Sequence, residues 1–320
     1  MSMSHFGHAV RCLGLATLTL GCASFVGGCP GASDGPKLSA AFDSARAWKQ
    51  LEAQVAFGPR PPGSEALEKT RVYLEGELKA AGLTPQREPF KGATPFGEIA
   101  MCNVFADFEG KPYGGKPAPM VVIGSHFDTK KMSVTFVGAN DAGSSTAVLL
   151  EIARVIASSG QRNVTYRFLF LDGEEALRTE WVDPDNRYGS RYHAEQLKKS
   201  GAADRVKAFV LLDMVGDKDL KLVRESYSDS WLLEAFMKAA KDNGLGAHFE
   251  GQREAITDDH LSFLNVGVPS VDMIDFDYGP NNAWWHTADD TLDKCSQESL
   301  GAIGKITLLG LPAVEDHILR

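Results

Sequence analysis

The chain has 320 residues, of which 43% are hydrophobic and 23% are charged, the profile of an ordinary folded protein with ample material for a core. This composition excludes a largely disordered chain. The formal net charge of −9 at pH 7 argues against nucleic acid as a partner.

The N-terminal segment has the features of an export signal. Arg11 is the only charged side chain in residues 1–28, and the apolar run over 13–26 is too short to span a bilayer comfortably. The small residues of VGGC, which end at Cys29, resemble a bacterial lipoprotein processing site. We therefore expect a signal peptide over 1–28, a lipidated Cys29 and a tether over 29–38. The protein would be exported to the bacterial envelope or periplasm and would meet the membrane only through this anchor. A plain cleaved signal is the alternative.

A single catalytic domain is expected over 39–320, because no internal repeat or long linker interrupts it. Two helical patterns come first, roughly over 40–55 and 65–81. The sequence GPRPPGS separates them, since its prolines end one helix and Ser64 can cap the next.

Short apolar runs that are typical of β-strands follow. They are MCNVFADF, PMVVIGSH, VTYRFLFLD, KAFVLLDMV and PSVDMID. Helical patterns lie between several of them, notably over 144–157 and 230–242. Strands that alternate with helices of this length predict an α/β sandwich around a largely parallel sheet. Cys102 and Cys295 also lie in this part of the chain, and whether they pair is left open.

Polar side chains follow several of the predicted strands, at the ends where reactive groups gather in α/β folds. They are His126, Asp128, Asp141, Glu174, Glu175, Asp213 and His286. Because these residues stand at strand ends or in adjoining loops rather than on helix surfaces, they predict a cation site.

Glu174 and Glu175 stand side by side directly after an apolar strand, where like charges repel. A zinc ion offsets this repulsion, because a ligated carboxylate is ionised. One glutamate can then bind the ion while its neighbour acts as a general base or acid. Asp141, Glu175 and His286 would supply the ligands that catalytic zinc typically takes.

Each of these residues also has a structural alternative. Asp141 can be a helix cap, Asp213 can start a turn, and His126 can be a hydrogen-bonded core histidine. The glutamate pair differs, because carboxylates are almost never buried without partners. Joint occurrence of all these residues therefore favours the metal.

The order of the motifs SHFDT, GANDAGSS, DGEEA, LLDMVG, DDHLSFLNVGVP and WWHTADDTLDK resembles the zinc aminopeptidase clan and, within it, the glutaminyl-peptide cyclotransferases. The likeness extends from about residue 45 to the end. The cyclotransferase branch is favoured by a Trp and YGSR after the twin glutamates, by Trp285 before His286, and by DDH at 258–260.

The resemblance implies a three-layer sandwich with a central mixed, largely parallel β-sheet flanked by helices. It also implies one zinc ion and conversion of the N-terminal glutamine of peptides or proteins to pyroglutamate, with release of ammonia. We expect a monomer. The implied residues are the metal ligands Asp141, Glu175 and His286, the proton shuttle Glu174, the carboxylate network of Asp213 and Asp259, and the pocket walls Trp181 and Trp285 with Phe276 or Tyr278.

Two other functions are left open. A two-zinc aminopeptidase would use His126 and Asp213 for its second metal, with Asp128 as partner of His126 and Asp141 bridging the ions. Glu174 would then activate water for peptide hydrolysis. A catalytically silent binding ectodomain would be expected to lack ligands, and none is missing. The pocket walls can also be ordinary core residues, and Trp181 follows the glutamates at one residue more than the animal cyclotransferases lead us to expect.

Overall fold

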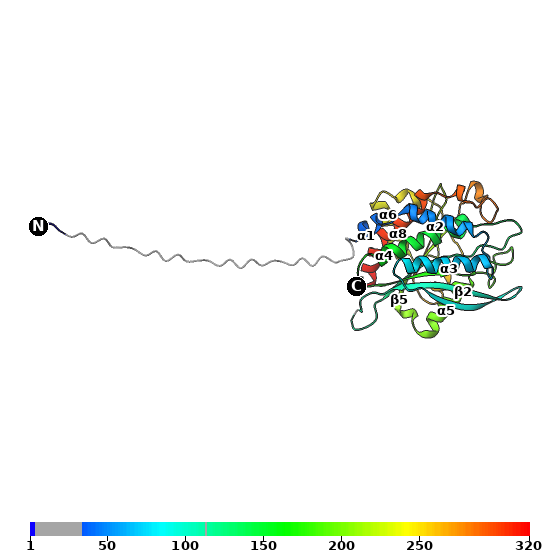
Figure 1. The fold of residues 1–320 in the computed structure, drawn as a ribbon, viewed down its shortest axis with the longest axis horizontal. Coiled ribbons are helices and arrows are strands. Elements are labelled where there is room, and N and C mark those ends of the chain that lie inside the picture. Colours follow the sequence, from blue (N-terminus) through cyan, green and yellow to red (C-terminus); the bar gives the residue numbers. More distant parts are fainter. Residues whose placement is uncertain (4–33, 113) are drawn as a thin grey trace. The chain divides into compact units, whose positions relative to one another are not determined.

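A six-stranded sheet is the centre of the computed structural model, with the strand order β1-β2-β4-β3-β5-β8 (Figure 1). The strands are β1 (Gln86–Thr94), β2 (Gly97–Phe108), β3 (Met120–His126), β4 (Thr165–Leu171), β5 (Val206–Asp213) and β8 (Ser270–Ile274). Strands β4, β3, β5 and β8 pair in parallel, whereas β1 and β2 form an antiparallel hairpin that joins the sheet at β4. The sheet is therefore mixed and largely parallel, as expected.

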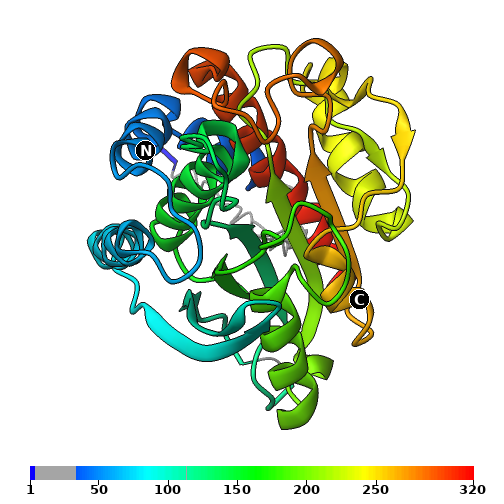
Figure 2. The ribbon, with the colours of Figure 1, turned by 90° about the vertical axis from the view of Figure 1, so that its right-hand side faces the viewer.

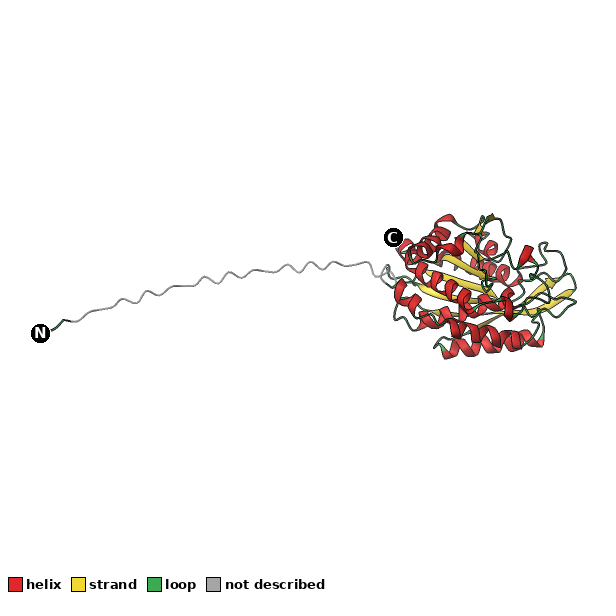
Figure 3. Cartoon of the chain, turned by 90° about the horizontal axis from the view of Figure 1, so that it is seen from above, coloured by secondary structure: helices red, strands yellow, loops and turns green. Residues whose placement is uncertain are grey.

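Helices cover both faces of this sheet (Figure 2). The helices are α1 (Gly35–Ala40), α2 (Ser44–Ala56), α3 (Glu65–Ala80), α4 (Ser145–Ala157), α5 (Tyr188–Ser200), α6 (Ser230–Asp242), α7 (His260–Leu264) and α8 (Gln297–Ile318). Helices α1 to α4, α6 and α8 share one hydrophobic core with the sheet, and α5 and α7 contribute to a second core on the opposite face. Figure 3 shows the strands between the helical layers, which confirms the three-layer sandwich.

Strand β4 shows why the strands of the central sheet appear in the sequence as mostly apolar runs. Phe168 and Phe170 pack into the larger core, whereas Leu169 and Leu171 pack into the core beneath α5 and α7. Successive side chains of a strand point to opposite faces, and both faces of this sheet are covered. Parallel strands buried in this way need apolar residues at every position.

The structure describes residues 1–3, 34–112 and 114–320, and the described residues from Asp34 onward belong to one compact unit. Cys29 and nearly all of the expected signal peptide lie outside these residues. Helix α1 begins at Gly35, inside the range expected for the tether over 29–38, and its Leu38 is buried in the core with α8. Among the described helices, none is both apolar and long enough to cross a membrane.

Local sequence signals set several helix boundaries. The Ser64 side chain accepts a hydrogen bond from the Leu67 backbone N–H at 3.1 Å and caps α3 as expected. Asp43 caps α2 in the same manner, so the helix expected over 40–55 begins at Ser44 and ends at Ala56. Cys102 and Cys295 are both free in the described structure.

Candidate active site

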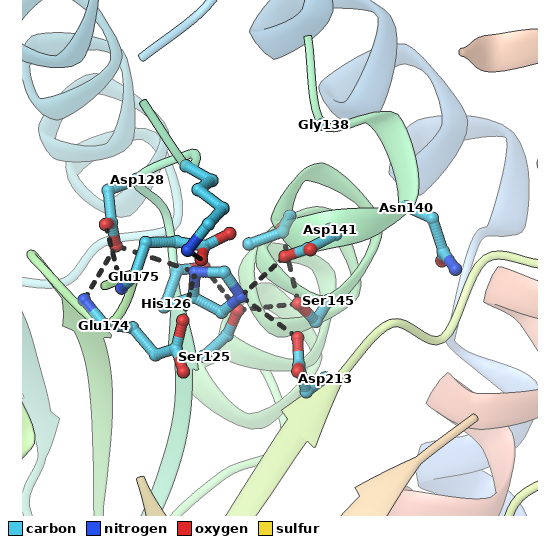
Figure 4. Close-up of polar contacts among 12 residues, drawn as sticks. Ser125, His126, Asp128, Gly138, Asn140, Asp141, Ser145, Glu174, Glu175 and Asp213 are labelled. Atoms are coloured by element: carbon cyan, nitrogen blue, oxygen red, sulfur yellow. Dashed lines mark hydrogen bonds and ion pairs between the residues drawn. The ribbon is translucent and has the colours of Figure 1, made fainter. Parts of the chain in front are cut away.

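The expected polar residues converge beyond the carboxyl ends of the parallel strands (Figure 4). His126 is the last residue of β3, and Asp213 is the last residue of β5. Glu174 and Glu175 follow β4, and Asp141 lies in the turn that leads into α4. Within the described residues, two groups of potential cation ligands form here: Asp141, Glu175 and His286 in one, and His126, Asp141 and Asp213 in the other.

The three expected zinc ligands form the first group. His286 Nε2 lies 3.2 Å from Asp141 Oδ2 and 3.1 Å from Glu175 Oε1. Glu175 is buried, and its Oε2 atom has no hydrogen-bond partner among the described residues. A buried carboxylate oxygen without a hydrogen bond is costly, so the donor set fits a divalent cation.

The second group shares Asp141 with the first. His126 Nε2 lies 3.2 Å from Asp141 Oδ1 and 3.1 Å from Asp213 Oδ1. The two oxygens of Asp141 therefore face different histidines. The arrangement retains every residue that the two-metal alternative requires.

The negative charge of the carboxylates in this site raises the pKa values of both histidines. Burial opposes protonation of His286, but the charge of Glu175 and the hydrogen bond to Asp141 outweigh it and raise its pKa to about 9. Burial likewise opposes protonation of His126, and the charges of Asp213 and Glu174 raise its pKa well above the usual value. In the metal-free protein these protons occupy the place of a cation among the carboxylates.

Asp128 holds the twin glutamates in place. Its Oδ1 accepts a hydrogen bond from the Glu174 N–H at 3.1 Å, and its Oδ2 accepts one from the Glu175 N–H at 3.3 Å. Asp128 Oδ1 also lies 3.5 Å from His126 Nδ1, as the expected partnership required. The buried carboxylate of Asp128 therefore orients His126 at the end of β3 and the two glutamates that follow β4.

Glu174 belongs to neither ligand group. Its Oε2 lies 3.8 Å from His126 Nδ1, and its side chain lines a cavity of about 220 Å³. Burial, together with the negative charge of Asp258, raises the pKa of Glu174 well above its usual range. A carboxyl with a raised pKa can both accept and donate a proton more readily than an ordinary glutamate, as a general base and acid must.

Aromatic side chains wall the same cavity. Trp181, Trp285 and Phe276 line it as expected. The Trp285 ring stacks on His286 with 4.0 Å between centroids, and the Phe276 ring meets Trp285 edge-on at 5.1 Å. Tyr278 is not part of this wall, because it is fully buried and its hydroxyl donates to Asp290 Oδ1 at 2.8 Å.

The cavity corrects the expected carboxylate network at one position. Asp213 and Asp258 line the cavity, whereas Asp259 is fully buried and does not line it. Asp259 stands immediately before α7, and its neighbour Asp258 is the residue that faces the cavity. Burial and the charge of Asp213 raise the pKa of Asp258 well above its usual range.

Comparison with known sequences decides the family. Residues 103–310 match Peptidase family M28. The chain belongs to this family. A mouse relative, named as a glutaminyl-peptide cyclotransferase-like protein, is 32% identical over 279 residues that cover 76% of this chain and 70% of the mouse protein.

Solved structures that resemble this chain agree with its assignment to family M28. A glutaminyl cyclase from an Acidobacteriales bacterium is 34% identical with a TM-score of 0.81, and the match covers 86% of this chain and 96% of that one. A Zn-dependent exopeptidase from Parabacteroides distasonis is 27% identical with a TM-score of 0.73, over 83% and 97% of the two chains. The expected resemblance to the glutaminyl-peptide cyclotransferases is confirmed. A catalytically silent binding ectodomain is not supported, since all three expected ligands converge.

Two further residues of the M28 protein escaped sequence reasoning. Lys130 is buried, with its Nζ 3.7 Å from Glu175 Oε2 and donating to the Ala176 carbonyl at 3.0 Å. Asp290 accepts hydrogen bonds from the backbone N–H groups of Asn140 and Asp141 at 2.7 and 3.1 Å. Lys130 directly follows the SHFDT motif and Asp290 is the last residue of WWHTADD, but a sequence does not tell which residues in or beside a motif point inward.

Two residues of the site have unusual backbone conformations. His286 and Met214, which follows Asp213, have left-handed φ angles of 53° and 48°. Such angles are uncommon outside glycine and tend to occur at functional sites. In both cases the turn brings the side chain into the wall of the cavity.

Proposed function

We propose that this protein is a zinc-dependent glutaminyl-peptide cyclotransferase that converts the N-terminal glutamine of peptides to pyroglutamate with release of ammonia. One observation carries the proposal. Glu174 lines an aromatic-walled cavity beside three converging cation ligands but belongs to neither ligand group. It is therefore free to transfer a proton at the substrate.

Asp141, Glu175 and His286 would hold one zinc ion, which, when bound, supplies polarisation of the side-chain amide carbonyl of the substrate. The Oε2 atom of Glu175, which is buried without a hydrogen bond, supports this assignment. Asp128 holds the backbone of both glutamates, so the ligand and the proton-transfer residue keep a fixed relation to each other.

Glu174 moves the proton in this reaction. As a carboxylate, it accepts a proton from the α-amine while that nitrogen attacks the side-chain amide carbon and the ring closes. It then gives a proton to the departing nitrogen as the carbon–nitrogen bond breaks, so ammonia leaves. The raised pKa of Glu174 suits both steps, because a catalytic acid–base group works best with a pKa near the operating pH.

The aromatic wall favours ring closure over hydrolysis. Trp181, Trp285 and Phe276 give the cavity apolar surfaces that can enclose a flat five-membered ring. Enclosure excludes bulk water, which the cyclisation does not consume. The carboxyls of Asp213 and Asp258 face the same cavity and complete the polar side of the pocket.

An aminopeptidase with two metals is the second candidate, and the convergence of His126, Asp141 and Asp213 favours it. The deciding experiment incubates purified protein with a glutaminyl peptide and, in parallel, with a leucyl peptide, each with a chelator control and zinc add-back. Cyclisation gives ammonia and a mass loss of one NH₃ without free amino acid. Release of free leucine would instead assign the peptidase reaction and contradict the proposal.

We further propose export and lipid anchoring at Cys29, on the basis of the apolar run over 13–26 and the VGGC sequence. Metabolic labelling with a radioactive fatty acid tests this. Label is expected in the membrane fraction of cells that produce the wild-type protein, and it is lost in Cys29→Ser. Soluble, unlabelled wild-type protein in the periplasm would overturn the anchor and leave the cleaved signal.

A further inference from the structure

A fully buried group of charged side chains lies outside the site described above. It consists of Glu225 from β6 (Arg224–Glu225), His260 at the start of α7, and Asp272 from β8. Glu225 Oε2 lies 3.3 Å from His260 Nε2, and Asp272 Oδ2 lies 3.6 Å from His260 Nδ1. None of the three lines the catalytic cavity.

This group is not a further cation site. Its two carboxylates face opposite nitrogens of one imidazole ring, so the ring separates them. Across the described ranges, the two groups of converging ligands are those of the active site. The contacts instead tie His260 to β6 on one side and to β8 on the other.

Glu225 is an ionised carboxylate that accepts hydrogen bonds from several donors. Its Oε1 accepts from the backbone N–H groups of Tyr227 at 2.9 Å and Ile256 at 3.1 Å. Its Oε2 accepts from the Ser228 hydroxyl at 2.8 Å as well as facing His260. Burial opposes ionisation, but the neighbouring His260 ring and the hydrogen bonds from the backbone outweigh it and lower the pKa of Glu225 to about 2.

These contacts bracket one short segment, residues 256–260. Glu225 binds the Ile256 amide at one end and the His260 ring at the other. Asp258, which faces the cavity, lies between them. On its other side the segment meets Arg187, whose guanidinium donates to the Asp258 carbonyl at 3.4 Å.

Arg187 connects this segment to the proton-transfer residue. Its backbone N–H donates to the Glu174 carbonyl at 2.6 Å, and its guanidinium reaches the Asp258 carbonyl. Arg187 therefore links the backbone of Glu174 to that of Asp258, and Glu225 holds the segment that carries Asp258.

We propose that Glu225 is a positioning residue for the cyclisation, because it fixes segment 256–260 at both ends and keeps the Asp258 carboxyl in the cavity that Glu174 lines. The inference rests on the cyclotransferase activity proposed above. Small displacements of groups around a reacting centre cost large factors in rate, so loosening this segment lowers turnover without removing any group that touches substrate.

The test uses Glu225→Gln in the full protein. Glutamine keeps an acceptor for the Ile256 amide, but its NH₂ group no longer accepts from Ser228 and no longer places a carboxylate beside the His260 ring. Glu315→Gln is the matched control, since Glu315 is also buried and accepts from Arg162 Nε at 2.7 Å, remote from the cavity lining. His260→Gln removes the same Glu225–His260 contact from the other side and serves if Glu225→Gln does not fold.

Two measurements decide the proposal. Glu225→Gln is expected to lower kcat for a glutaminyl peptide by about tenfold with little change in KM and with wild-type zinc content. In a double variant with Asp258→Asn, Glu225→Gln is expected to lower kcat hardly any further, because both changes act through Asp258. Any effect of Glu315→Gln on kcat should instead multiply with that of Asp258→Asn, because the two sites are independent. Hydrogen exchange of the amides over 255–260 is expected to accelerate in Glu225→Gln and not in Glu315→Gln.

Independent, multiplying losses for Glu225→Gln and Asp258→Asn would overturn the positioning role, as would unchanged exchange over 255–260. A wild-type protein that releases no ammonia would instead overturn the proposed function. The exchange measurement does not depend on activity, so it separates the two failures.

Discussion

The carboxylate of Asp290 accepts a hydrogen bond from the backbone N–H of Asp141 at 3.1 Å. It also accepts one from the Asn140 N–H at 2.7 Å and one from the Tyr278 hydroxyl at 2.8 Å. Asp290 lies four residues beyond His286, so it links the two loops that carry Asp141 and His286. A buried carboxylate that orients ligand-bearing loops is expected to affect metal affinity although it binds no metal itself.

Replacement of Asp290 by alanine is therefore expected to weaken zinc binding by roughly 10- to 100-fold. Competition with a chromogenic chelator measures this affinity. Asp289→Ala is the control, because its side chain is exposed and immediately adjacent in sequence. Equal zinc affinity in the Asp290 and Asp289 variants would show that the link between the loops does not organise the site.

Glu174→Gln separates proton transfer from metal binding. The amide keeps the shape of the side chain but neither accepts nor donates the transferred proton, so we expect activity to fall by about 10²- to 10⁴-fold. Zinc content should stay at the wild-type level, because Glu174 belongs to neither ligand group. Ammonia release and metal analysis on the same preparation test this, and normal turnover by the zinc-loaded variant would sink the proton-shuttle assignment.

His286→Ala is expected to lose zinc and activity together. The side chain contributes the one histidine of its ligand group, and its ring stacks on Trp285 in the cavity wall. A catalytic zinc site with one of its protein ligands removed binds the ion poorly. Full zinc occupancy in this variant at micromolar metal would remove His286 from the ligand set.

Much of the architecture was predictable because both faces of the sheet are covered. Strands β3, β4, β5 and β8 are buried at nearly every position, and their ends coincide with the polar motifs. Strand β1 was missed because it lies at the sheet edge and carries several exposed polar residues. Helix α8 was missed for another reason, since it contains Pro312 and several glycines that disfavour a helix locally.

Packing explains why α8 forms despite that composition. A Cβ atom on Gly304 would lie 2.1 Å from the Phe42 ring, and one on Gly310 would lie 2.3 Å from the Phe236 ring. The glycines therefore admit aromatic side chains close to the helix axis, and burial of these rings offsets the weak helix propensity. Such a contact joins residues far apart in the sequence, so local patterns do not reveal it.

The same limit applies to the site. The twin glutamates and the histidines were recognisable from motif and strand position, but DDH does not tell which aspartate faces the cavity. That depends on the backbone at the start of α7, where Asp258 lines the cavity and Asp259 does not.

Asp258→Asn is accordingly expected to reduce kcat for a glutaminyl peptide by about 10²-fold, because it replaces the titratable carboxyl that lines the same cavity as Glu174. Asp259→Asn is expected to act mainly on stability, which thermal unfolding detects, since its carboxylate is fully buried away from the cavity. Kinetics of both variants at a temperature where each is folded make the comparison. A larger loss of kcat in Asp259→Asn would restore the assignment made from sequence.

Zinc affinity is expected to depend on pH through His286. In the metal-free protein the pKa of His286 is raised to about 9, so below that pH the ring carries a proton that zinc must displace. The apparent zinc affinity should fall roughly tenfold per pH unit below pH 9 and level off above it, as far as this one proton is concerned.

The stability of the metal-free protein should change with pH in the opposite direction. A raised folded-state pKa stabilises the fold fully below the unfolded value of 6.5, and that contribution is lost as the pH rises through about 9. Thermal unfolding of the metal-free protein across this range should show the decline in stability, and His286→Gln should remove the part of that decline that His286 causes.

Chelator competition at the same pH values gives the zinc affinity. An affinity that stays constant between pH 7 and pH 9 would mean that zinc displaces no proton from His286, and the ligand assignment would then have to be revised.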